Sequence, residues 1–170
     1  MDLFEVVEKR RSIRKFKSTS IPDEDLKKIL EAGRLAPSGG NRQPWSFIVV
    51  RKPETKKALA TVANLQRFIA DADTVLIVLG DPAVSKNLYK QDPMIAIEHI
   101  VLASTALGYG TCWIGAFNET EVKGIAKVPE NLTVVALLPI GVPDETPPLR
   151  PRRAFKEIFH KEFYGRPLVM

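Results

Sequence analysis

The stretch "EKRRSIRKFK", residues 8–17, places six Lys or Arg side chains within ten positions. If the first helix ends near Arg10, the chain up to Phe16 runs extended, and alternate side chains leave it on one side. Arg10, Ser12 and Arg14 then point together. Two guanidinium groups and a hydroxyl suit a phosphate, because the planar fork of arginine binds phosphate oxygens bidentately. A solvated run of charge, or an arm that binds polyanions, is the alternative interpretation.

A second polar group lies in "APSGGNRQPW", residues 36–45. Two glycines at a helix end let the backbone approach a ligand closely. Ser38, Asn41 and Gln43 supply donors and acceptors with little charge. This chemistry suits the edge of a heteroaromatic ring that carries carbonyl groups and ring nitrogens. Considered alone, the stretch is more typical of an ordinary loop rich in turn formers.

Other catalytic signatures are excluded by their context. "GYGTCWIG", residues 108–115, follows a helix and leads into a strand, whereas the dinucleotide fingerprint needs strand, glycines and helix in that order. The sequence has no P-loop and no G-x-S-x-G nucleophile elbow. Cys112 and His99 fall in apolar stretches, which predicts a buried thiol and a core histidine. Glu98 is expected to be partly buried, either beside a basic partner or facing a pocket. With one Cys and two His, a Cys/His zinc site is excluded.

Strands and helices alternate along the chain. Apolar periodicity and capping residues predict helices near 2–10, 22–36, 54–63, 92–108 and 118–127, and strands over 45–50, 74–80, 111–117 and 132–141. The first two strands are apolar enough to be buried on both faces. Pro139 suggests that the last strand lies at an edge or contains a bulge. We therefore predict an α/β (α+β) sandwich with helices on both faces of the sheet.

Composition limits the classes of protein to which this chain can belong. The chain of 170 residues is expected to form one domain, 1–170, and its 45% hydrophobic content is that of a globular protein. A net charge of +5 permits an anionic partner, yet aromatic residues are not interleaved with the basic run, as in single-strand nucleic-acid binders. Cys112, the single cysteine, excludes an internal disulfide. Neither a secretory signal nor a membrane-spanning run is visible, so we expect a cytoplasmic protein.

The C-terminal region differs from the rest. Four prolines between residues 143 and 151 predict an extended connector. Beyond it, Phe155, Phe159 and Phe163 make the tail too apolar to remain free in water, so it is expected to pack on something, such as a second copy of the chain.

Together these residues resemble the FMN-dependent nitroreductase family. The resemblance lies in "RRSIRKF", "IPDEDLKKILEAGRLAPSGGNRQPWSFIVV", "ALGYGTCWIGAF" and "RPRRAFKEIFH", which occur in the family's order and span nearly the whole chain. The resemblance implies a mixed central sheet flanked by helices and an intertwined homodimer. In that homodimer the C-terminal arm, residues 147–170, is exchanged and packs on the partner subunit. It also implies two FMN molecules at the interface.

By family position, arginines from both ends of the chain would hold the phosphate and ribityl chain, and Arg14 would lie near the N1–C2=O edge of the isoalloxazine. The glycine-rich loop of the other subunit would complete the surroundings of the ring, and backbone near Gly115 would lie over it, with an amide N–H of Gly115 or Ala116 near N5. The implied cofactor-binding residues are Arg10, Arg11, Ser12, Arg14, Pro37, Ser38, Gly39, Asn41, Gln43, Ile114, Gly115, Arg150 and Arg152. Neither a metal nor a catalytic side chain is implied, because the flavin performs the chemistry.

The implied activity is an NAD(P)H oxidoreductase with a ping-pong mechanism. NADH or NADPH would deliver hydride to the flavin, and an electron-poor acceptor, such as a nitroaromatic or quinone, would then be reduced at the same face. A flavin-binding or redox-sensing module with little turnover is the alternative. A basic nucleic-acid-binding domain is the third hypothesis, and it would bind through residues 9–17 with strong salt dependence. We expect a small-molecule acceptor as partner, without nucleic acid or membrane.

Overall fold

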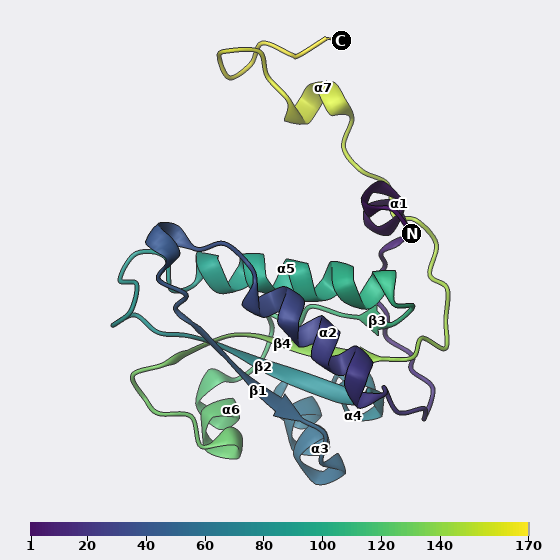
Figure 1. Cartoon of the computed structure of the whole chain (residues 1–170), viewed down its shortest axis with the longest axis vertical. Helices are drawn as coiled ribbons and strands as arrows, with labels where there is room; N and C mark the ends of the chain where they lie inside the picture. Colours follow the sequence, from purple (N-terminus) through teal and green to yellow (C-terminus); the bar gives the residue numbers. More distant parts are fainter. Residues whose placement is uncertain (170) are drawn as a thin grey trace.

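The computed structural model describes residues 1–169, in which one central sheet is covered by helices on both faces (Figure 1). The strands lie in the order β1 (Trp45–Val50), β2 (Thr74–Gly80), β4 (Thr133–Gly141) and β3 (Gly110–Thr111), and each neighbouring pair is antiparallel. A parallel bridge between Ser12 and Thr111 adds the N-terminal segment beside β3, so the sheet is mixed there. The predicted α+β fold with a mixed, helix-flanked sheet is confirmed.

Two predicted strands differ in detail. β1 was expected to be buried on both faces, but it is the edge strand, and Ser46 and Val49 are exposed. The expectation was wrong because hydropathy reports an apolar strand and not its rank in the sheet. The strand expected over 111–117 is reduced to the two residues of β3 and an isolated bridge between Ile114 and Leu137.

Pro139 lies inside the central strand β4 and not at an edge. Its carbonyl accepts a hydrogen bond from the Cys112 amide at 3.3 Å. The ring nitrogen points to the same side of β4 as this carbonyl, and β3 has already ended there, so no strand requires an N–H from residue 139. The missing N–H is therefore tolerated at this position. A register shift does occur between β2 and β4, but at Val78 and Leu79.

Helices on the two faces cover separate cores. α2 (Asp23–Arg34) and α5 (Gln91–Ala106) lie on one face, whereas α3 (Pro53–Val62), α4 (Phe68–Asp71) and α6 (Glu119–Ala126) lie on the other (Figure 1). Side chains alternate along the buried strand β2. Val75 and Ile77 pack with the α3, α4 and α6 side, and Leu76 and Val78 pack with α2 and α5.

The N-terminus follows the prediction closely. α1 (Leu3–Lys9) begins with a capping box between Asp2 and Glu5 and ends at Arg10. The chain then runs extended, bridged to Thr111 and later, at Phe16, to Pro143. A continuous extended segment therefore presents alternate side chains to opposite sides.

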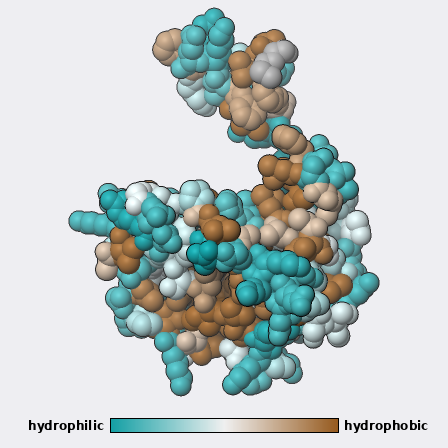
Figure 2. Space-filling model, viewed as in Figure 1, coloured by the Kyte–Doolittle hydropathy of each residue, from teal (hydrophilic) through white to brown (hydrophobic). Residues whose placement is uncertain are grey.

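The C-terminal arm stands away from the body (Figures 1 and 2). Residues 144–154 contain neither helix nor strand, as predicted for the connector, and α7 (Phe155–Ile158) is a single turn. Beyond it the chain folds back on itself, and a bridge joins His160 to Pro167. Phe163 and Tyr164 are 70% and 95% exposed, so the apolar surface of the arm is left uncovered by the chain's own body.

Candidate functional site

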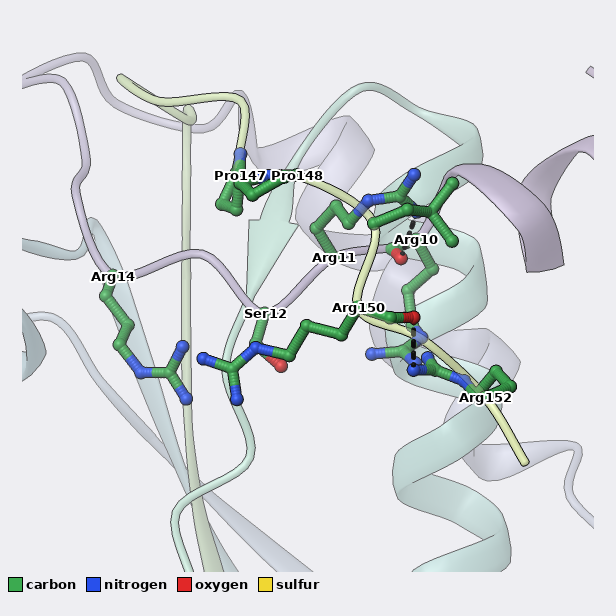
Figure 3. A pocket seen from close by; sticks show the side chains of 9 residues that line it. Arg10, Arg11, Ser12, Arg14, Pro147, Pro148, Arg150 and Arg152 are labelled. Carbon is green, nitrogen blue, oxygen red and sulfur yellow. Dashed lines mark hydrogen bonds between the residues drawn. The ribbon is translucent and has the colours of Figure 1, made fainter.

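A cavity of about 250 Å³ lies where the segment after α1 meets the proline-rich connector (Figure 3). Its lining comes from both ends of the chain: Arg10, Arg11, Ser12, Arg14, Pro147, Pro148, Leu149, Arg150 and Arg152. All the site residues that sequence analysis named in these two segments lie around it. The sequence predicted only a connector at Pro147, Pro148 and Leu149, because prolines signal chain geometry and not chemistry.

The guanidinium groups of this arginine cavity have no carboxylate partner in the part of the chain that the structure describes. Among residues 1–169, the arginines that form ion pairs lie elsewhere, on α2, directly after β1 and in the arm. In Figure 3, Arg150 reaches past Ser12 toward Arg14, while Arg10 and Arg152 extend toward the opposite side. Like charges gathered in one cavity repel one another, and an anion bound between them removes that repulsion.

The Arg11 guanidinium lines the cavity and is also hydrogen-bonded to the backbone at the end of α1. Its Nη1 atom donates to the carbonyl of Glu8 at 2.6 Å and to that of Arg10 at 2.8 Å. These carbonyls belong to the C-terminal end of α1, where a cation also meets the negative end of the helix dipole. Arg11 therefore lines the cavity while holding the end of the helix that delivers Arg10.

Hydrogen bonds join the two segments that form the cavity. The Asp144 amide donates to the Lys15 carbonyl at 2.9 Å, and the Lys15 ammonium lies 2.9 Å from an Asp144 carboxylate oxygen. The Arg14 amide donates to the Glu145 carboxylate. The hydrogen bond from Lys15 lowers the pKa of Asp144. Both side chains of this pair are exposed, so it fixes the geometry of the cavity more than it stabilises the fold.

The second predicted group, Pro37 to Gln43, forms a loop around η1 (Gly39–Asn41) that is held by hydrogen bonds between its own residues. Ser38 Oγ accepts a hydrogen bond from the Gln43 amide at 2.9 Å, and Gln43 Nε2 donates to the Asn41 carbonyl at 3.2 Å. The side chains of Asn41 and Gln43 are exposed. The loop therefore presents amide groups outward from a fixed backbone.

Within one chain, the loop and the arginine cavity are apart. The loop adjoins the N-terminal end of α5, where the Gly39 amide donates to Asp92 at 3.2 Å, and the cavity lies toward the other end (Figure 1). α5 has 16 residues, a length of about 24 Å at 1.5 Å per residue. A single chain thus does not bring the two predicted groups around one ring.

The third predicted group lies between β3 and α6. The backbone of Ile114 exchanges hydrogen bonds with Leu137, donating at 2.9 Å and accepting at 3.1 Å. Ile114 is buried, whereas Gly115 and Ala116 are exposed, and the Gly115 amide has no hydrogen-bond partner within the described chain. This short segment, joined to Ser12 through β3, offers an exposed backbone N–H.

Other candidate chemical groups resolve into structural roles. Cys112 is buried, as predicted, and burial raises the pKa of its thiol, which disfavours the reactive thiolate. His99 is half-buried, with Nδ1 3.3 Å from the Ala32 carbonyl of α2. Glu98, expected to be partly buried, is exposed, because it lies on the side of α5 that faces away from the sheet.

Sequence analysis missed Asp92, which is buried in the first turn of α5 and bonded to the predicted loop. The only signal was an acid at the start of an otherwise apolar helix. Among residues 1–169, no cluster of His, Cys, Asp and Glu side chains has the composition to bind a metal ion. No helix in the same part of the chain has the length and hydropathy needed to cross a bilayer.

Comparisons with known sequences show which proteins this chain resembles. A sequence model of the Nitroreductase family matches residues 7–91 and 61–142. A protein of Archaeoglobus fulgidus, provisionally named NADH dehydrogenase/NAD(P)H nitroreductase, is 38% identical over 143 residues, covering 80% of this chain and 82% of the relative. The NADPH-flavin oxidoreductase of Vibrio harveyi is 28% identical over 176 residues, covering 94% of this chain and 73% of that protein.

Solved structures agree with the sequence comparison. A nitroreductase family protein from Clostridium novyi NT superposes with a TM-score of 0.81 at 36% identity, covering 98% of this chain and 97% of the other. An FMN-dependent nitroreductase from Clostridium difficile R20291 gives 0.87 at 28% identity, covering 94% and 99%. From the arginine segment through β4, the sequence, the fold and the solved relatives agree, and the chain belongs to the nitroreductase family.

Proposed function

We propose that this protein is an FMN-dependent oxidoreductase that transfers hydride from NADH or NADPH to an electron-poor acceptor, such as a nitroaromatic or a quinone. The observation that carries the proposal is the arginine cavity, in which cationic side chains from both chain ends face one another without carboxylate partners in residues 1–169. The names of the Vibrio harveyi and Clostridium difficile relatives, a flavin oxidoreductase and an FMN-dependent nitroreductase, support the same cofactor.

The cavity suits the single phosphate of FMN. Arg10 and Arg152 would bind phosphate oxygens through their planar forks, the Ser12 hydroxyl would donate one further hydrogen bond, and Arg150 would reach the ribityl side. Arg11 would assist by holding the end of α1. The lack of a dinucleotide fingerprint agrees with a mononucleotide cofactor.

The remaining residues would orient the ring. Arg14 would lie near the N1–C2=O edge, where a fixed positive charge stabilises the negative charge of a reduced isoalloxazine. The exposed Gly115 amide would donate to N5, and Ile114 would hold that backbone against β4. A bound FMN would supply the hydride chemistry between nicotinamide and acceptor in a ping-pong mechanism, so no side chain of this chain would need to act as acid or nucleophile.

A homodimer would complete the site. The loop of Pro37, Ser38, Gly39, Asn41 and Gln43 lies too far along α5 from the cavity of its own chain, so a partner would supply it. Uncovered apolar side chains support such an interface: Phe4 of α1 is 79% exposed, Met94 of α5 is 43% exposed, and the arm is apolar (Figure 2). We expect this dimer in the reducing cytoplasm, given the single cysteine.

The test is the visible spectrum of the purified protein with FMN, before and after NADH or NADPH is added without oxygen. We expect a yellow protein whose absorption near 450 nm is lost with reductant and returns when a quinone or nitroaromatic is added. Bound flavin that the nicotinamides do not reduce would instead favour a flavin-binding or redox-sensing module. A protein with no saturable affinity for FMN would overturn the proposal, and salt-sensitive DNA or RNA binding through residues 9–17 would then favour the nucleic-acid alternative.

A further inference from the structure

Three residues of the loop from Ser38 to Gln43 have a left-handed backbone conformation. Gly40, Asn41 and Gln43 have φ angles of 58°, 55° and 50°, in the left-handed region. Glycine enters that region freely and asparagine more readily than other residues, but Gln43 remains there only if its surroundings hold it. Strain of this kind is concentrated at ligand sites, where a particular side-chain direction is needed. The loop therefore requires anchors.

One anchor reaches the loop from a helix. The Gly39 amide donates to Asp92 Oδ2 at 3.2 Å, which ties the loop to the first turn of α5. Gly39 also fits closely there, because a Cβ atom at this position would lie 2.3 Å from a methyl carbon of Leu88, just before α5. The second anchor, between Ser38 and Gln43, lies within the loop itself. Asp92 is thus the side chain that relates the loop to the body.

Stability does not explain why this anchor is a carboxylate. Asp92 is 3% exposed, and it forms no ion pair with a cation in residues 1–169. A carboxylate in the first turn of a helix does gain from the helix dipole, but it would gain this on the surface too. Burying an unpaired charge is unfavourable, and an apolar residue would suit this position better. What the carboxylate provides at this position is an acceptor oxygen for the Gly39 amide.

We infer that Asp92 is a positioning residue of the flavin site, which fixes the Gly39 amide and so sets where the side chains of Asn41 and Gln43 meet the edge of the isoalloxazine. This inference rests on the proposed function, because it takes FMN as the ligand. Asp92 does not contact the ring; it acts through the loop. A preformed loop binds the ring without first being ordered, so loss of the anchor weakens binding.

The experiment compares Asp92→Ala and Asp92→Asn in the full-length protein. Asparagine keeps an acceptor oxygen at the same reach, whereas alanine leaves the Gly39 amide without a partner. Glu119 provides a matched control, because its Oε1 accepts the Val134 amide at 3.0 Å on the opposite face of the sheet. Glu119→Ala removes this bond and Glu119→Gln keeps it, away from the loop, and both variants also lose the ion pair between Glu119 and Lys123, whose atoms lie 3.6 Å apart.

The primary measurement is the Kd for FMN, from quenching of flavin fluorescence. We expect Asp92→Ala to weaken binding about tenfold to 100-fold, the range for a lost hydrogen bond to a charged group, and Asp92→Asn to stay within about threefold of the native protein. Both Glu119 variants should bind FMN as the native protein does. In Asp92→Ala, the visible bands of bound FMN should also shift, and hydrogen exchange of residues 38–43 should accelerate. A merely structural role would also accelerate this exchange, but it would leave the visible bands of bound FMN unchanged.

The outcomes separate the two proposals. A native protein that does not bind FMN overturns the proposed function and this inference with it. If the native protein binds FMN and Asp92→Ala binds it with the same Kd and spectrum, only the role of Asp92 is overturned. Weak binding by both Asp92→Ala and Glu119→Ala would reveal a general loss of stability and also contradict the inference. If Asp92→Ala does not fold, Asp92→Ser, which is too short to reach Gly39, replaces it in the same comparison.

Discussion

Ser12 and Thr111, separated by 99 positions in the sequence, form a parallel bridge, and the next amide, that of Ile13, donates to the Thr111 carbonyl at 2.9 Å. This bridge lays the arginine segment along the outer edge of β3. It also places that segment beside the chain that continues to Ile114 and Gly115. A single extended segment thus connects a cationic cavity with an exposed backbone N–H, which is the spatial relation that a phosphate linked to a flat ring requires.

The phosphate assignment is tested by Arg10→Ala combined with Arg152→Ala. Each arginine would make charge-assisted hydrogen bonds worth about 1.5–3 kcal/mol, so the double variant should lose about 100-fold or more in FMN affinity while keeping its fold. Colour after purification and a fluorescence titration measure the loss. The control removes two exposed cations on the far face of the sheet, Lys57→Ala with Arg67→Ala, and should retain FMN. Flavin retained by the arginine variant would refute the assignment.

The role of the arm is tested by truncation after Pro147. We expect a colourless monomer in light scattering, because the truncation removes both the apolar surface of the arm and the cationic side chains of Arg150 and Arg152. Phe163→Ser with Tyr164→Ser separates these effects, since it weakens the dimer but leaves the arginines. That variant should recover FMN at high protein concentration. A truncated monomer that stays yellow would contradict the shared site.

Packing between α2 and α5 depends on Gly33. A Cβ atom there would lie 2.6 Å from Cδ1 and 2.7 Å from Cγ1 of Ile100, which is fully buried. Overpacking costs about 1–3 kcal/mol, against a gain of about 1 kcal/mol from better helix propensity. We expect Gly33→Ala to lower the free energy of unfolding by up to about 2 kcal/mol in urea titrations. Gly124→Ala on α6, which meets nothing within 4 Å, should raise it by up to about 1 kcal/mol. Equal effects of the two substitutions would contradict this packing.

Acid stability depends on the contact between Tyr109 and Asp25. The Tyr109 hydroxyl donates to Asp25 at 2.7 Å, and this bond, followed by that from Lys28, lowers the pKa of Asp25 from its ordinary 3.8. Because the pKa of Asp25 is lowered in the folded protein, the ionised carboxylate stabilises the fold, and this stabilisation is fully present above pH 3.8. The stabilisation is lost as the pH falls through the lowered pKa. Tyr109→Phe should therefore be less stable than the native protein at pH 5–7, and the difference should shrink below pH 3.8.

Urea titrations at several pH values measure this difference. Tyr89→Phe is the control, since the Tyr89 hydroxyl makes no hydrogen bond within residues 1–169. Its stability should follow that of the native protein at every pH. A Tyr109→Phe deficit that persists unchanged in acid would show that Asp25 is not the group responsible.

Local patterns made much of the fold predictable. The capping box of Asp2 and Glu5 involves residues three apart, and the alternation of Arg10, Ser12 and Arg14 follows from extended backbone alone. The buried strand β2 is recognisable because seven consecutive residues avoid water. Each of these features depends on neighbours in the chain, which is what a sequence displays.

Long-range relations were not predictable in this way. β1 and β2 have similar composition, yet β1 is an edge strand, because its rank depends on which strands pair with it. Asp92 carried only one signal, an acid at the start of an apolar helix, and its role was not visible because that role is defined by the Gly39 amide, 53 positions away.

By itself, the sequence determined the five helices α1, α2, α3, α5 and α6, the buried strand and the cationic segment, and its motifs indicated the family. Only the tertiary structure decided that arginines from residues 10–14 and 150–152 line one cavity, and that the Ser38–Gln43 loop lies at the other end of α5. The physical reason is that periodicity records which side of an element avoids water, whereas the closure of a cavity depends on strand order and on where chain segments cross.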